Sequence, residues 1–118
     1  MQKVISQMWK VTIQGKEETV KELVEYSYKA YGEETPTKIA GIICYEAGDV
    51  LRDMVRIDDY PNIANVYEKQ GQVSLGDVLA MSQLLCAMKG WDFDKIYQDG
   101  CERAIERCKE KLQGRDGF

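Results

Sequence analysis

The stretch that decides the fold is TPTKIAGIICYEAGDVLRDMVRI, residues 35–57. It opens on Thr35 and Pro36, a capping hydroxyl followed by a proline at the first helical position, which is a typical helix start. Behind this start, apolar residues recur at steps of three and four, the period of a helix with one apolar stripe. They are Ile39, Ile42, Ile43, Ala47, Val50, Leu51 and Met54. The stretch therefore predicts an amphipathic helix that ends near residue 57.

Three carboxylates lie along the margin of this stripe. Glu46, Asp49 and Asp53 are spaced by three and four residues, so they share one row of the helix. A carboxylate at the edge of a core is costly unless a cation pairs with it. We expect the neighbouring Arg52 and Arg56 to project to other faces, so a hard Mg²⁺ or Mn²⁺ ion is one physical solution. The alternative is that the row is the solvated edge of a surface helix.

The rest of the chain also follows a helical period. Further helices are predicted at 17–31, at 73–89 ending at Gly90, and from 93 onwards behind a capping Asp92. Residues 58–71 form a polar connector with a short helical turn at 63–68. Residues 3–13 suit a short helix, with a strand as the alternative. The pattern predicts an all-α protein with one domain over 1–118, a core at 17–112 and a frayed tail at 113–118.

The composition excludes several classes of function. With 16 basic and 20 acidic residues the net charge is −4, which argues against nonspecific binding to a nucleic-acid polymer. No apolar run approaches the roughly 20 residues that span a bilayer, so we expect no membrane partner. Without an apolar stretch typical of a signal peptide near the N-terminus, we expect a cytoplasmic protein. The absence of histidine excludes Ser-His and Cys-His catalysis and mixed Cys/His zinc sites.

The four cysteines are expected to be reduced and buried. None lies in a Cys-x-x-Cys spacing, and each falls in an apolar helical pattern, where a thiol behaves as a small hydrophobe. They are Cys44, Cys86, Cys101 and Cys108.

A second acidic segment, Ser74-Leu75-Gly76-Asp77-Val78-Leu79, repeats the Gly-Asp-aliphatic order of Gly48-Asp49-Val50-Leu51. If the two helices pack antiparallel, their acids can converge. The order of Tyr45–Leu51, Leu75–Leu79 and a closing Gly-Trp-Asp turn in Met88–Asp94 resembles the MazG-like all-α nucleotide pyrophosphohydrolases. The resemblance covers residues 38–110.

The resemblance implies a helical bundle completed by dimerisation and a specific chemistry. Such proteins hydrolyse a nucleoside or deoxynucleoside triphosphate to the monophosphate and pyrophosphate. Carboxylates from both helices hold Mg²⁺, which neutralises the phosphates and helps form the attacking hydroxide; Mn²⁺ is a substitute. The residues that match these roles are the metal ligands Glu46, Asp49 and Asp77, with Asp53 as a nearby substitute, the catalytic Glu46, and the phosphate-binding Arg103 and Arg107. A bundle this thin also favours a homodimer or tetramer.

Ser74 is the main departure from the pattern, because the family carries a glutamate there. Ser74 and Asp77 also fit a capping box that opens a helix. Two alternatives to the enzyme therefore stay open. One is a catalytically impaired MazG-like module that binds a nucleotide or a protein, and the other is a helical adaptor without ligand chemistry.

Overall fold

The computed structural model describes residues 16–31 and 35–114. Within these ranges the structure is helical and contains no strand, which confirms the predicted all-α class. Its elements are α2 (Lys16–Tyr31), α3 (Pro36–Asp59), the short 3-10 turn η1 (Pro61–Ile63), α4 (Ala64–Lys89) and α5 (Phe93–Leu112). None of the helices in the described part is long and apolar enough to cross a membrane. The predictions for residues 3–13 and for the last residues of the tail lie outside the described ranges.

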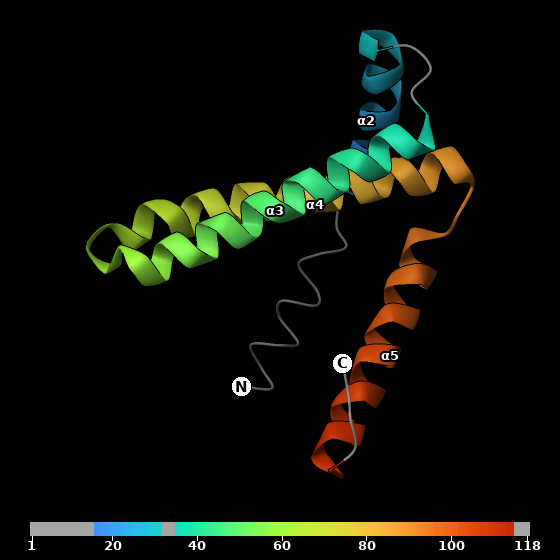
Figure 1. Ribbon diagram of the computed structural model, residues 1–118. Helices are drawn as coiled ribbons and strands as arrows, with labels where there is room; N and C mark the ends of the chain where they lie inside the picture. The colour runs from blue at the N-terminus through green and yellow to red at the C-terminus, as the bar shows by residue number, and fades with distance from the viewer. Residues whose placement is uncertain (1–15, 32–34, 115–118) are drawn as a thin grey trace.

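The centre of the fold is the antiparallel pair of α3 and α4, which lie side by side along most of their length (Figure 1). The start of α3 is the predicted one: the Thr35 hydroxyl accepts a hydrogen bond from the Lys38 amide at 3.2 Å, and Pro36 is the first helical residue. The chain reverses its direction between α3 and α4 at Pro61, the first residue of η1. Proline has no amide hydrogen to continue the preceding helix, so it favours the reversal.

Helix α4 is longer than the sequence predicts, because the short helical turn expected at 63–68 continues without a break into the helix expected from residue 73. The helix begins at Ala64 and runs without interruption through Gly71 and Ser74. Gly71 is buried against α3: a Cβ atom there would lie 2.8 Å from Met54 Cε and 3.7 Å from Asp53 Cβ. The glycine thus marks a close approach of two helices, and it does not end one.

The position of Ser74 inside α4 also excludes the capping-box interpretation. The residue that precedes the first turn of α4 is Ile63, which makes no side-chain capping hydrogen bond. Ser74 lies ten residues into the helix, and its side chain is buried. Its hydroxyl does not cap the helix and instead donates a hydrogen bond to Asp53 of α3.

The apolar core of the described chain is small. The buried hydrophobic residues are Ile39, Leu84 and Cys86, whereas Leu51 is 66% exposed and Val73 63% exposed. Leu51 is two residues from the buried Asp53, so it projects from the opposite side of α3. Helix α3 thus carries apolar residues on two faces, of which α4 covers one.

The burial predicted for the cysteines is only partly right. All four thiols are free; Cys86 is buried and Cys101 partly buried, but Cys44 and Cys108 are exposed. The last two lie on helix faces that no other described helix covers.

The outer helices α2 and α5 contact α4 and no other described helix (Figure 1). Gly90 ends α4 in the left-handed conformation with φ +69°, and Asp92 caps α5 by accepting a hydrogen bond from the Lys95 amide at 3.2 Å. This geometry confirms the turn predicted at 90–92. Helix α5 then diverges from the α3–α4 pair (Figure 1).

The continuity of α4 can be tested at Gln70, an exposed residue in the first half of the helix. We expect Gln70→Pro to lower the free energy of unfolding by about 3 kcal/mol or more, because proline removes a helical hydrogen bond and clashes with the preceding turn. Urea unfolding followed by circular dichroism measures the change, with Gln70→Ala as the matched control that retains stability. A connector at this position would accept proline, so equal unfolding midpoints for the two variants would contradict a continuous α4.

Candidate functional site

Asp53 is the most completely buried charged residue of the described chain, with 0% of its surface exposed. Helix α3 directs it at α4, where the Ser74 hydroxyl donates a hydrogen bond of 3.0 Å to Asp53 Oδ2. The other oxygen, Oδ1, has no hydrogen-bond partner. An ionised carboxylate can accept about four hydrogen bonds. Burial therefore removes water from Asp53 and replaces it only in part, which leaves the site short of positive charge or donors.

Arg52 supplies the nearest cation, contrary to the expectation that it projects to another face. Its Nη1 lies 3.3 Å from Asp49 Oδ1, and its Nη2 lies 3.6 Å from Asp53 Oδ1. The second distance is that of an ion pair and is too long for a hydrogen bond. The long side chain reaches along the helix surface to both acids, and the three-residue spacing from Asp49 to Arg52 was the sequence signal for this contact.

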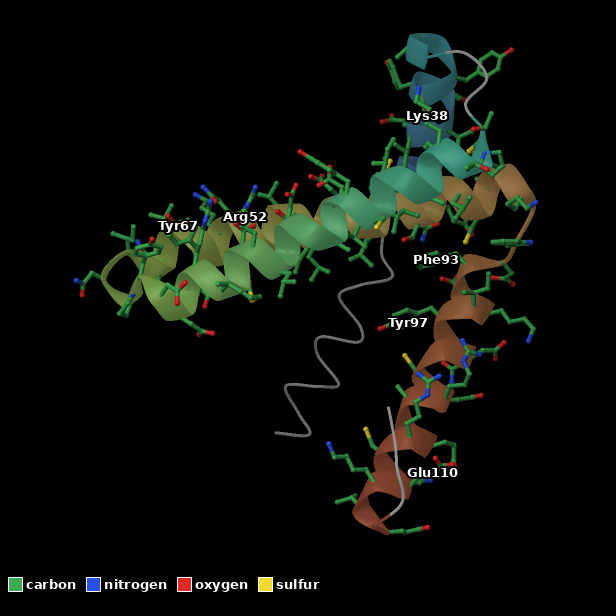
Figure 2. The ribbon with its side chains drawn as sticks, in the orientation of Figure 1. Lys38, Arg52, Tyr67, Phe93, Tyr97 and Glu110 are labelled. Atoms are coloured by element: carbon green, nitrogen blue, oxygen red, sulfur yellow. The ribbon has the colours of Figure 1, made fainter. Side chains whose placement is uncertain are left out.

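Arg56, the other nearby arginine, does not share this arrangement. Its guanidinium carbon lies 5.7 Å from the centre of the Tyr67 ring, so it packs over an aromatic side chain of α4. Figure 2 labels Arg52 on α3 and Tyr67 on α4.

Glu46 is the point at which the acids of the two helices meet. Partial burial raises the pKa of its carboxyl above the ordinary value, and the negative charges of Asp77 and then Asp49 raise it further. Asp77 belongs to α4, whereas Glu46 and Asp49 belong to α3. The antiparallel pair therefore brings carboxylates from both helices within electrostatic range of one another, as the sequence predicts. We call Glu46, Asp49, Asp53 and Asp77 the carboxylate cluster.

The carboxylate cluster has the type of side chain that binds a hard cation, but its side chains are not close enough together to bind one as they stand. Oxygen ligands are those that Mg²⁺ and Mn²⁺ prefer, and the unpartnered Asp53 oxygen is a buried acceptor that a cation would satisfy. Within residues 16–31 and 35–114, however, no three acidic or cysteine side chains are gathered closely enough to hold a metal ion. Arg52 pairs with Asp49. Coordination would require rotation of these side chains.

The two arginines expected at the phosphate lie elsewhere in the chain. Arg103 and Arg107 line a shallow depression on α5 together with four acids, Asp99, Glu102, Glu106 and Glu110. Helix α5 contacts only α4 among the described elements, and Figure 2 shows its labelled Glu110 far from Arg52. The fold of one chain therefore does not bring these arginines to the carboxylate cluster, and interleaved acids balance their charge.

Comparisons with protein-family models, with curated proteins and with solved structures find no match for this chain. The likeness to the MazG-like enzymes thus stays a prediction that depends on the residues themselves.

The hydrogen bond from Ser74 to Asp53 should contribute measurably to stability. We expect Ser74→Ala to lower the free energy of unfolding by about 1.5–3 kcal/mol, the range for a hydrogen bond to a charged group. The matched control is Ser82→Ala on the same helix, since the Ser82 hydroxyl bonds only to the Val78 carbonyl at 2.7 Å. That control should change stability by less than about 0.5 kcal/mol. Equal effects of the two substitutions in urea unfolding would show that Asp53 does not depend on Ser74.

The raised pKa of Glu46 predicts that, without divalent cations, this residue lowers the free energy of unfolding as the pH rises. The folded chain holds this proton more tightly than the unfolded chain, so the contribution of Glu46 to stability falls as pH rises above the ordinary value of 4.5. With a chelator present, Glu46→Gln should therefore unfold at higher urea concentration than the unsubstituted protein at neutral pH. The difference should vanish below pH 4.5.

The control for this experiment is Glu68→Gln, an exposed glutamate on α4. As a substitution of an exposed residue, it should change the free energy of unfolding at neutral pH by less than about 0.5 kcal/mol. If Glu46→Gln follows the same profile as the unsubstituted protein, Glu46 does not experience the charges of Asp77 and Asp49.

Proposed function

We propose that this chain is a Mg²⁺-dependent nucleoside triphosphate pyrophosphohydrolase of the MazG-like kind, with Mn²⁺ as a substitute ion. The observation that carries the proposal is the buried Asp53, whose Oδ1 accepts no hydrogen bond and lies 3.6 Å from the Arg52 guanidinium. It belongs to a helical row with two further acids, of which Glu46 is within electrostatic range of Asp77. Buried carboxylates persist when an opposite charge compensates them. A phosphorylated substrate carries negative charge, so it would approach this face together with a divalent cation.

The pairing of Asp53 with Ser74 accounts for the main departure from the family pattern. The resemblance places a glutamate at position 74, on the face of α4 that is turned to α3. The serine found there instead donates its hydrogen bond to Asp53 at 3.0 Å. We propose that Asp53 supplies from α3 the negative charge that residue 74 would supply from α4. The carboxylate cluster then retains four acids, the number that the pattern expects.

Within the carboxylate cluster, some residues would bind the cation and one would accept a proton from water. Glu46, Asp49 and Asp77 would hold the cation, with Asp53 behind them. A Mg²⁺ ion bound there would neutralise phosphate charge and increase the acidity of a water molecule. Glu46, the catalytic residue that the resemblance implies, would receive the proton of the attacking water.

A second copy of the chain would complete the fold that this function needs. The uncovered face of α3 carries Leu51 at 66% exposure and Val55 at 47%, and that of α4 carries Val73 at 63%. Apolar side chains at this density along a helix pair are typical of an interface. We therefore include a homodimer or tetramer in the proposal, in which α5 of another copy would be the element able to bring Arg103 and Arg107 to the substrate.

One observation favours the alternative of a module with impaired catalysis. Arg52 already pairs with Asp49 and Asp53, so part of the negative charge is neutralised within the chain. A protein that keeps this pairing in the presence of Mg²⁺ would bind a nucleotide or a protein partner without turnover.

Release of pyrophosphate from a panel of nucleoside and deoxynucleoside triphosphates, with Mg²⁺ or Mn²⁺, tests the proposal. We expect turnover that a chelator abolishes, and we expect Asp49→Asn and Asp77→Asn each to reduce it about 100-fold, the upper range for disturbing a metal site. The matched control is Asp58→Asn, an exposed acid near the end of α3, which should retain the rate.

Sedimentation of the same samples should give the same oligomer for all three variants and the unsubstituted protein. A loss of activity then cannot be explained by a loss of assembly. Absence of turnover with every substrate and either metal would reject the enzyme and favour the impaired module. Retained rates in Asp49→Asn and Asp77→Asn would place the active site elsewhere.

A further inference from the structure

Helix α5 has an apolar face that is largely uncovered within the described chain. Apolar and small residues recur along this face at steps of four and three, the spacing of a seam between two helices. They are Tyr97, Cys101, Ala104, Ile105, Cys108 and Leu112. Ile105 is 53% exposed and Leu112 is 87% exposed. Among the described elements α5 contacts only α4, and it diverges from the α3–α4 pair (Figure 1).

A helix of 20 residues in this position needs a partner. Isolated helices are marginal in water, and helices in proteins gain most of their stability by packing an apolar face. A membrane surface does not fit, because α5 carries as many acids as bases and so lacks the basic polar face that binds anionic lipids. The apolar face of α5 therefore suits another helix of a protein.

The sequence of α5 is complementary to a second copy of itself in antiparallel orientation. About a two-fold axis between Ala104 and Ile105, Cys101 faces Cys108 of the other copy. Tyr97 and Leu112 face each other in the same way at the two ends of the seam. Small side chains then lie near the centre, where they permit a close approach of the helices, and large side chains fill the wider gap at the ends.

Charged residues at the edge of this face agree with the antiparallel alignment. Glu102 and Lys109 lie on one edge of α5, and the alignment brings Glu102 of each copy near Lys109 of the other. A parallel pair in register would instead place like charges side by side, which is unfavourable.

The contacts that these two residues make within the chain do not prevent the pairing. Glu102 accepts a hydrogen bond from Gln98 at 3.1 Å, and Lys109 lies 3.6 Å from Glu106. Both contacts join exposed side chains of one helix, and contacts of this kind contribute little to stability. Both side chains can therefore turn to a second copy.

We propose that α5 forms an antiparallel helix pair with α5 of a second copy of this chain, centred between Ala104 and Ile105. This interface is separate from the uncovered face of α3 and α4, and it does not depend on the cation site of the proposed function. If both surfaces are used, the two different two-fold contacts give a tetramer. The pairing leaves Arg103 and Arg107 on the outer side of the helix pair.

Sedimentation of Ile105→Glu tests the interface. The substitution places a carboxylate at the centre of the pair, next to its counterpart in the other copy, so we expect the mass of the assembly to fall to about half. The matched control is Glu106→Gln, which removes a charge from the outer face and should retain the mass. Circular dichroism of both variants tests whether the helices are intact. Equal masses for Ile105→Glu and the unsubstituted protein would overturn the proposal.

Two complementary cysteine variants test the antiparallel alignment. Cys101→Ser and Cys108→Ser are each prepared together with Cys44→Ser, and they are treated with the oxidant diamide. Diamide takes two protons and two electrons from two thiols as their disulfide forms. After exchange of chains in urea and refolding, the mixture of the two variants should give a covalent dimer on a denaturing gel, because Cys108 of one faces Cys101 of the other.

Each variant treated alone should not form the covalent dimer. Its two remaining cysteines on α5 would lie roughly 10 Å apart along the helix axis, beyond the reach of a disulfide. Cross-linking of each variant alone but not of the mixture would indicate a parallel pair and overturn the proposal. A mass of one chain at every concentration would also overturn it and would indicate that another protein covers α5. Metal-dependent turnover is measured separately, so the proposed cation site can stand when this interface fails.

Discussion

The structure depends on one interaction, the contact of the buried Asp53 with Ser74 across the α3–α4 interface. A carboxylate with 0% exposure can stay at this interface because the facing surface of α4 is small and polar and because Arg52 pairs with it from α3. Gly71 leaves room for α3 to approach, and Ser74 offers a hydroxyl at 3.0 Å. A larger apolar residue at either position would fill the space and leave Asp53 without its donor. The same antiparallel pair brings Asp77 of α4 within electrostatic range of Glu46 of α3.

Local signals predicted the parts of the fold that local chemistry decides. The capping threonine and proline at 35–36 and the glycine and aspartate at 90–92 mark helix ends in the structure where the sequence places them. The continuity of α4 between the helical turn expected at 63–68 and the helix expected from 73 was not predicted, because a polar segment with Gly71 looks like a connector until its burial against α3 is known. Tertiary packing, which no local pattern displays, overrode the weak helix propensity of glycine.

The sequence likewise predicted only part of the candidate site. The row of Glu46, Asp49 and Asp53 was evident from spacing, and the approach of Asp77 followed from an antiparallel pair. Of the two interpretations of Ser74, the helix cap was wrong, because its partner is 21 residues away in sequence and on another helix. Arg52 was assigned to another face because a helical wheel follows Cα positions, while a long side chain reaches its neighbours. Arg103 and Arg107 depend on the direction of α5, which pattern alone does not give.

The central claim is that the carboxylate cluster holds a divalent cation. The most direct measurement is anomalous diffraction from crystals of the protein grown with Mn²⁺. Our account predicts an anomalous peak among the carboxylates of Glu46, Asp49 and Asp77, next to Asp53. Crystals that contain Mn²⁺ only at other acids, such as those along α5, would contradict it.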